Sequence, residues 1–147
     1  MQDQDSTPGT PRTYEIPDDP LSSKRKSILI LEDDDSFAAA VRETLEEQDY
    51  SVTVVPSGTE GVQKILASDF DAILCDMVMP NFPGDMFYLA VQQSRPHLCK
   101  RFIFMSGYQR DVKITQFIRS TGGMVLWKPF EMRRLFDALE TVTGRSK

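Results

Sequence analysis

The sequence has few of the residues that build metal sites of the zinc type or disulfide frameworks. It contains two cysteines and one histidine among 147 residues, and neither the number nor the spacing suits such a site. Cys75 lies within an apolar run and is interpreted as a small buried hydrophobic residue. Cys99 stands apart from it. This cysteine usage predicts a reduced, cytoplasmic setting.

Long apolar runs and an excess of positive charge are absent as well. No run approaches the roughly 20 apolar residues that are needed to cross a bilayer, and residues 1–20 are too polar for a secretory signal. The formal net charge is -5, from 22 acidic and 17 basic residues. We therefore expect neither nucleic acid nor a membrane as a partner.

Residues 1–25 differ in composition from the rest of the chain. They lack periodicity and hold Pro8, Pro11, Pro17 and Pro20 among acidic and hydroxyl residues. Such a segment cannot bury enough apolar surface to offset its ordering entropy. We therefore expect a flexible tail over 1–25 and one folded domain over 26–147.

Short apolar runs alternate with helical periods after the tail. The pattern predicts strands at 28–31, 51–55, 72–75, 102–105 and 124–127, and helices at 37–45, 58–67, 87–93, 112–120 and 131–142. Three of the strands are apolar on both faces, as a parallel sheet with helices on both sides requires. This order predicts a doubly wound α/β fold. Helical spacing predicts that Val62, Ile65 and Leu66 share one face of 58–67, and that Leu89, Ala90 and Gln93 share one face of 87–93.

Polar residues follow four of the five predicted strands. They are Glu32–Asp35 after the first strand, Asp76 after the third, Ser106 after the fourth and Lys128 after the fifth. The carboxyl ends of parallel strands meet at one edge of the sheet, where ligands of doubly wound folds bind. We therefore expect these side chains to line one pocket. Ser57, after the second strand, is interpreted only as part of a helix start.

The grouping of these side chains favours phosphoryl chemistry. Carboxylates from two strands repel one another unless a cation lies between them, and such oxygen ligands suit Mg²⁺. Lys128 can pair with a carboxylate or a phosphoryl oxygen, and the Ser106 hydroxyl can donate to one. A carboxylate in this company can act as a nucleophile and form an aspartyl phosphate. Asp34 and Asp35 are better explained as an acidic helix start.

The ordered set of motifs resembles the receiver domain of two-component response regulators over about residues 26–143. The matching segments are Ile28–Asp34, Asp76–Pro80 with Gly84, Met105–Gly107 and Lys128–Phe130. The successive separations from Asp33 to Asp76, Ser106 and Lys128 are 43, 30 and 22 residues. The resemblance implies a flavodoxin-like (βα)5 three-layer sandwich with a five-stranded parallel sheet in the order 2-1-3-4-5.

The resemblance also implies a function and a role for each site residue. Asp76 is the phosphoacceptor, which takes a phosphoryl group from a phosphohistidine on a histidine kinase or phosphotransfer protein. Lys128 and Ser106 assist the reaction. The implied Mg²⁺ ligands are Glu32, Asp33, Asp76 and the backbone carbonyl of Val78. The module would catalyse only its own phosphorylation and dephosphorylation, so we do not expect a turnover enzyme.

Three positions depart from the family pattern. Val125 stands where the family often has a tyrosine or phenylalanine that takes part in switching, and Trp127 lies nearby without a known equivalence. Val78 and Tyr108 occupy the positions that flank the phosphoryl group in the family. Both side chains would restrict an attacking water, so we expect slow self-dephosphorylation.

Phosphorylation is expected to change a protein-interaction surface. The chain ends at Lys147, shortly after the last predicted helix, so we expect action through protein contacts rather than through an output domain. The candidate surface is formed by the fourth helix, the fifth strand and the fifth helix, with Gln109–Arg119, Val125 and Arg133–Arg134 as contacts. A free single-domain regulator, a phosphate-shuttling intermediate and a piece of a hybrid kinase all stay open.

Three other functions are compatible with parts of this pattern. A phosphatase of the haloacid dehalogenase type needs a second acid two residues after its nucleophile, and Val78 occupies that position. A flavin carrier of similar topology is disfavoured because the acidic loop after the first strand would repel a flavin phosphate. A pseudo-receiver that binds partners without phosphorylation stays open, because the aromatic residue of the usual switch is missing.

Overall fold

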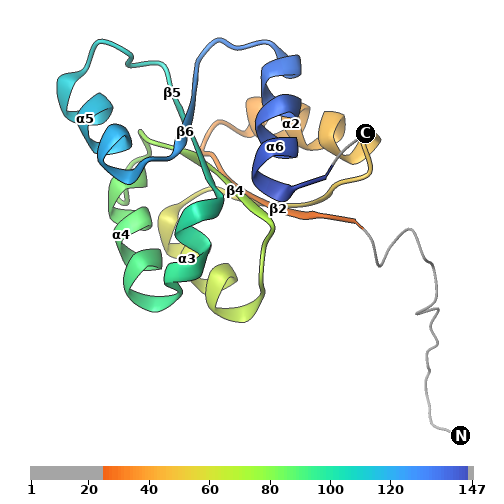
Figure 1. The fold of residues 1–147 in the computed structure, drawn as a ribbon, viewed down its shortest axis with the longest axis horizontal. Coiled ribbons are helices and arrows are strands. Elements are labelled where there is room, and N and C mark those ends of the chain that lie inside the picture. The colour runs from red at the N-terminus through yellow and green to blue at the C-terminus, as the bar shows by residue number, and fades with distance from the viewer. Residues whose placement is uncertain (1–24, 146–147) are drawn as a thin grey trace, which may run out of the picture.

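The computed structural model describes residues 25–145, in which strands and helices alternate as predicted (Figure 1). A short 3-10 helix, η2, precedes the fourth strand. The predicted tail over 1–25 lies outside the described residues except for Arg25. The elements are β2 (Ser27–Leu31), α2 (Asp35–Glu47), β3 (Ser51–Val55), α3 (Gly58–Ala67), β4 (Ala72–Asp76), α4 (Gly84–Ser94), η2 (Pro96–Arg101), β5 (Phe102–Ser106), α5 (Val112–Thr121), β6 (Met124–Trp127) and α6 (Met132–Thr143).

All five strands of the described residues form one parallel sheet in the order β3-β2-β4-β5-β6. In chain order this is 2-1-3-4-5, so the predicted doubly wound, flavodoxin-like fold is confirmed. The register aligns the strand ends: Leu31 pairs with Cys75, Asp76 with Met105, and Ser106 with Trp127. Residues that follow the strands are therefore brought to one edge of the sheet.

Helices cover both faces of the sheet, because successive strand side chains point in opposite directions. Leu29 and Leu31 pack into a core beneath α3, α4 and α5, and Ile28 and Ile30 pack into a second core beneath α2 and α6 (Figure 1). All four side chains are fully buried. Burial of each contributes about 1.5–3 kcal/mol relative to exposure, so the strands anchor the domain from both sides.

Two predicted helical faces contain residues that the fold leaves exposed, although in α3 Ile65 is buried and Val62 packs against the core. Leu66 is 59% exposed, and Leu89 is 48% exposed. Helix α4 begins at Gly84, three residues earlier than predicted. Its buried residues are Gly84, Phe87, Tyr88 and Val91. They follow the i, i+3, i+4, i+7 spacing of an amphipathic helix, and this stripe turns Leu89 towards the outside.

Local capping explains where several helices begin and end. The Ser57 hydroxyl accepts a hydrogen bond from the Glu60 amide, which confirms its interpretation as a helix start. Asp34 caps α2 in the same way through the Phe37 amide. Gly122 ends α5 in the left-handed conformation, with φ of 71°, which glycine adopts without steric cost.

Two expectations from composition can be compared with the fold. Cys75 is fully buried and Cys99 is partly buried, and both are free thiols. The interpretation of Cys75 as a buried hydrophobic residue is therefore confirmed. In the part of the chain from 25 to 145, none of the helices combines the length and the hydropathy that a membrane span requires.

Candidate functional site

Three carboxylates converge at the carboxyl ends of β2 and β4. One oxygen atom from each of Glu32, Asp33 and Asp76 can be chosen so that all three lie within 4.8 Å of one another. Glu32 and Asp76 are 1% and 6% exposed, whereas Asp33 is open to solvent. Like charges held this close repel, and their oxygens are the ligands that hard divalent cations prefer. The predicted convergence of these residues is confirmed.

Lys128 reaches this group from the end of β6. Its ammonium donates to Glu32 Oε1 at 2.7 Å and to Asp76 Oδ2 at 3.5 Å. Its backbone amide donates to the Ser106 carbonyl at 2.7 Å, which extends the β5–β6 pairing. One cation therefore faces two of the three carboxylates, and the group as a whole keeps an excess of negative charge.

The pKa values of Glu32 and Lys128 reflect this arrangement. Burial raises the pKa of Glu32 to about 6, although the hydrogen bond from Lys128 opposes the change. Burial works to lower the pKa of Lys128, but its hydrogen bond to Glu32 and the charges of Asp76 and Glu32 outweigh burial and raise it. Lys128 therefore stays charged at neutral pH, and Glu32 holds a proton more readily than an exposed glutamate does.

The loop after Asp76 is held tightly against the carboxylate. The Val78 amide donates to Asp76 Oδ1 at 3.2 Å, and the Gly84 amide donates to the Met77 carbonyl at 3.1 Å. A Cβ atom at Gly84 would lie 2.6 Å from the Asp76 carbonyl oxygen and 2.9 Å from Met77 Cα. Only glycine lets α4 begin this close to the loop, which explains why Gly84 belongs to the motif.

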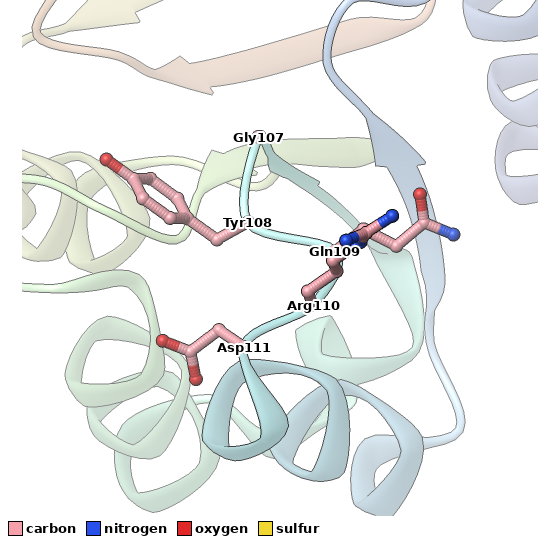
Figure 2. Close-up of a pocket in the computed structure, with 5 residues that line it drawn as sticks. All are labelled: Gly107, Tyr108, Gln109, Arg110 and Asp111. Atoms are coloured by element: carbon pink, nitrogen blue, oxygen red, sulfur yellow. The ribbon is translucent and has the colours of Figure 1, made fainter.

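Ser106 lies at the end of β5, fully buried. Its hydroxyl oxygen accepts a hydrogen bond from the Tyr108 amide at 3.0 Å. The following residues, Gly107–Asp111, form a loop with a hollow of about 590 Å³ beside it. Figure 2 shows the Tyr108 ring pointing to one side of this loop and the Gln109 side chain to the other. The Tyr108 side chain is 56% exposed, so most of its ring is open to solvent.

Val125 and Trp127 lie on the same face of β6, and both pack at the edge of the core beneath α5. Together with Gln109 and Thr115 they line a hollow of about 480 Å³ between β6 and α5. The hollow beside Val125 is thus lined by an aromatic side chain, that of Trp127, which lies opposite Ser106 in the strand register.

All six predicted site residues come from the same edge of the sheet, and the acidic helix start also behaves as expected. Glu32, Asp33, Asp76 and Lys128 form one cluster, and Val78 and Ser106 follow the adjacent strand ends. Asp34 caps α2. Sequence reasoning missed Phe37, whose ring lies against the Lys128 ammonium. Its only signal was an apolar position in the first turn of a helix.

Comparison with known proteins agrees with this geometry. The family model described as "Response regulator receiver domain" matches residues 28–140. The response regulator receiver protein CpdR of Brucella abortus (strain 2308) is 27% identical over 115 residues, which are 78% of this chain and 94% of CpdR. Four other curated relatives are longer proteins, of which the chain spans between 12% and 53%.

Solved structures show the same fold. A response regulator from Chloroflexus aurantiacus J-10-fl is 27% identical, with a TM-score of 0.74 and coverage of 83% of this chain and 100% of that one. The receiver domain of the sensor histidine kinase PA1611 from Pseudomonas aeruginosa PAO1 is 22% identical, with a TM-score of 0.73 and coverage of 82% and 99%. That structure has a magnesium ion coordinated in its active site cleft.

Proposed function

The chain belongs to the response regulator receiver domain family, and from that premise we propose that Asp76 is its phosphoacceptor. Receiver domains of two-component systems interact with histidine kinases or phosphotransfer proteins. The observation that carries the proposal is the convergence of a buried aspartate, two further carboxylates and a lysine at one edge of the sheet. This arrangement supplies a nucleophile together with a cation for the phosphoryl charge.

The proposed reaction moves one phosphoryl group. A carboxylate oxygen of Asp76 forms a bond to phosphorus while the P–N bond of the donor phosphohistidine breaks. The electron pair of that bond stays with the imidazole nitrogen, which then takes a proton from solvent. The Val78 amide already donates to Asp76 Oδ1, and Oδ2 faces Lys128, so backbone and side chain orient the nucleophile.

Lys128 and Ser106 assist this transfer in the proposal. The Lys128 ammonium lies 3.5 Å from Asp76 Oδ2, close enough to offset charge on a phosphoryl oxygen in the transition state. The Ser106 hydroxyl accepts from the Tyr108 amide, so its own hydrogen remains to be donated elsewhere. Donation to a phosphoryl oxygen would draw the 106–108 segment towards Asp76.

Mg²⁺ fits the donor set of this site. Glu32, Asp33, Asp76 and the Val78 carbonyl would hold it, since all four offer oxygen atoms and three of them bear charge. When bound, the ion would supply positive charge that offsets the charge of these carboxylates and of the incoming phosphoryl group. Its presence in the PA1611 receiver cleft supports this assignment.

We further propose that the α5–β6–α6 surface is where the phosphorylated form meets its downstream protein target. The surface exposes more basic than acidic residues, with Asp111, Glu131 and Asp137 as its exposed acidic ones, although the chain is acidic overall. Its exposed basic residues are Arg110, Lys113, Arg119, Arg133 and Arg134. Two further hollows, of about 300 and 410 Å³, follow the exposed side of β6. Both features favour a protein partner that carries acidic and apolar residues.

The same site argues against substrate turnover. A phosphatase that uses an aspartate nucleophile needs a second acid to complete its cycle, and Val78 stands where it is required. The proposal is therefore self-phosphorylation and self-dephosphorylation without a separate substrate. The cytoplasmic setting expected from the cysteines stays a prediction.

Mass spectrometry tests the proposal directly. The protein is incubated with Mg²⁺ and acetyl phosphate, and we expect a gain of about 80 daltons, one phosphoryl group bound as an aspartyl phosphate. Asp76→Asn should gain nothing. Asp49→Asn is the matched control, because Asp49 is exposed and has a φ of 66°, which asparagine adopts equally well. A wild-type protein that gains no mass would favour the pseudo-receiver alternative.

A further inference from the structure

Phe37 contacts the site lysine, although it is not one of the charged or hydrogen-bonding residues of the site. It lies in the first turn of α2, where its ring packs beneath the Lys128 side chain. The distance from Lys128 Nζ to the ring centroid is 4.5 Å, within the range of a cation–π contact. The backbone of Phe37 is fixed as well, because its amide donates to the Asp34 cap at 3.0 Å.

A second aromatic ring packs against Phe37. The Phe130 ring meets Phe37 edge to face, with centroids 6.0 Å apart and planes at 88°, the favoured geometry for an aromatic pair. Phe130 follows Lys128 by two residues, so a single segment supplies both the cation and the ring that supports Phe37. The contact therefore ties the start of α2 to the end of β6.

The position of the ring limits where the ammonium can go. Lys128 has Glu32 at 2.7 Å, Asp76 at 3.5 Å and the face of Phe37 at 4.5 Å. A lysine side chain has many rotamers, and fixing one of them costs entropy. An aromatic face attracts the cation without accepting a proton and without competing for its strong hydrogen bonds, so the three donor hydrogens remain available to oxygen atoms.

We propose that Phe37 is a positioning residue, which holds the Lys128 ammonium towards Asp76 for phosphoryl transfer. This inference rests on the proposed function of Asp76 and Lys128. Phe37 touches neither the nucleophile nor the transferred group and acts only through the lysine. Its aromatic face, rather than its bulk alone, is the property that matters.

The first test separates the aromatic face from apolar bulk. Phe37→Leu keeps an apolar side chain but removes the ring, and Phe37→Tyr keeps the ring. We expect Phe37→Leu to slow phosphorylation by acetyl phosphate by about three- to tenfold, the range of a partly desolvated cation–π contact. Phe37→Tyr should stay within about twofold of the wild type. Equal rates for Phe37→Leu and the wild type would overturn the inference.

The second test observes the Lys128 side chain directly by NMR. In the protein with ¹³C-labelled lysine, the Lys128 ε-methylene protons should be shifted upfield by the ring current, and the shift should vanish in Phe37→Leu and persist in Phe37→Tyr. An unshifted wild-type signal would also overturn the inference. A general loss of stability does not produce this pattern, because the other lysine signals would then move too.

The third test asks whether Phe37 acts through Lys128. In a Lys128→Ala background, adding Phe37→Leu should leave the remaining phosphorylation, measured as mass gained over hours, unchanged within about twofold. A further loss equal to that in the wild-type background would show that Phe37 acts through the fold, and the inference fails. If the wild type itself gains no mass at Asp76, the proposed function has failed instead.

Discussion

Two charged clusters lie at opposite ends of the sheet, and their compositions are inverted. At the carboxyl end, three carboxylates lie together and the cation Lys128 pairs with two of them, Glu32 and Asp76. Before β4 and β5, at the amino end, the single carboxylate of Asp69 faces three basic groups, with Arg101 at 3.3 Å, His97 at 3.4 Å and Arg95 at 3.7 Å. The first cluster is mostly buried, and the second is largely open to water.

The difference separates a binding site from a structural contact. Arg95 and Arg101 also donate to the carbonyls of Ile65 and Phe70, at 2.8 Å each, so the amino-end cluster ties η2 to the chain around β4 through hydrogen bonds within the protein. The carboxyl-end cluster has more negative charge than its one lysine can balance. Unbalanced, buried charge costs stability and is kept where a ligand completes it.

The largest expected effect comes from removing the lysine of the carboxyl-end cluster. Lys128→Ala should slow phosphorylation by acetyl phosphate by about 100- to 1000-fold, the usual cost of removing one group that stabilises transition-state charge. Arg101→Ala, its counterpart at the amino end, should leave the rate within about twofold. Rates are measured by mass spectrometry over time. Comparable losses in both variants would show that the two clusters do not differ in function.

Without Mg²⁺, the two clusters should make the free energy of unfolding depend on pH in opposite directions. The pKa of Glu32 is raised from 4.5 to about 6, so the folded state binds more protons between these values. The free energy of unfolding should therefore fall by up to about 2 kcal/mol as pH rises from 4.5 to 6. Denaturant unfolding at several pH values measures this slope, which Glu32→Gln should flatten.

Asp69 supplies the opposite slope. Burial works to raise its pKa, but the hydrogen bond from His97 and the charge of Arg101 outweigh it and lower the pKa below 3.8. Its contribution is therefore present above pH 3.8 and lost as pH falls through the lowered pKa. Above pH 3.8, Asp69→Asn should lower the unfolding free energy by an amount that does not vary with pH, and only the slope in the acidic range should disappear. A different slope between pH 4.5 and 6 in this variant would contradict the assignment of that slope to Glu32.

The access of water to Asp76 provides a further test of the carboxyl-end cluster. Val78 follows Asp76, the proposed phosphoacceptor, by two residues, Tyr108 follows Ser106 by two, and both side chains are exposed. Because both can restrict an attacking water, we expect a phosphorylated lifetime of minutes or longer. Tyr108→Ala should shorten it by about tenfold, because an attacking water then meets less obstruction. Leu66→Ala removes an equally exposed apolar side chain from α3 and should not change the lifetime. A wild-type lifetime of seconds would refute the expectation.

The smallest expected effect is the stabilisation of the folded protein by Mg²⁺, which should depend on the carboxyl-end cluster alone. At about five times its dissociation constant, the ion should stabilise the wild type by about 1 kcal/mol, or about 3–5 °C in thermal unfolding. Asp33→Asn should lose most of this gain, and without Mg²⁺ it should be no less stable than the wild type because a repulsion is removed. Asp69→Asn should keep the whole gain. If Asp33→Asn responds to Mg²⁺ as the wild type does, Asp33 is not a ligand.

The candidate site was largely predictable because it depends on strand ends. Parallel strands place their carboxyl ends at one edge whatever the detailed packing, so Asp33, Asp76 and Lys128 were expected to meet before any distance was known. The phase of α4 was not predictable in the same way. Spacing suggested Leu89, Ala90 and Gln93 as one face, whereas the buried residues are Gly84, Phe87, Tyr88 and Val91. Gly84 lies against Asp76 and Met77, a contact that helical spacing does not reveal.

Local sequence patterns predict the order of the elements, the sheet buried on both faces and the types of side chain at its carboxyl edge. Periodicity in local runs carries that information, and it needs no knowledge of distant contacts. Tertiary packing places the Lys128 ammonium closer to Glu32 than to Asp76 and sets the Phe37 ring against it. Tertiary packing also brings Asp69 to the basic groups at the amino end of the sheet. Those contacts join residues up to 96 positions apart, and they depend on rotamers and packing that no local pattern encodes.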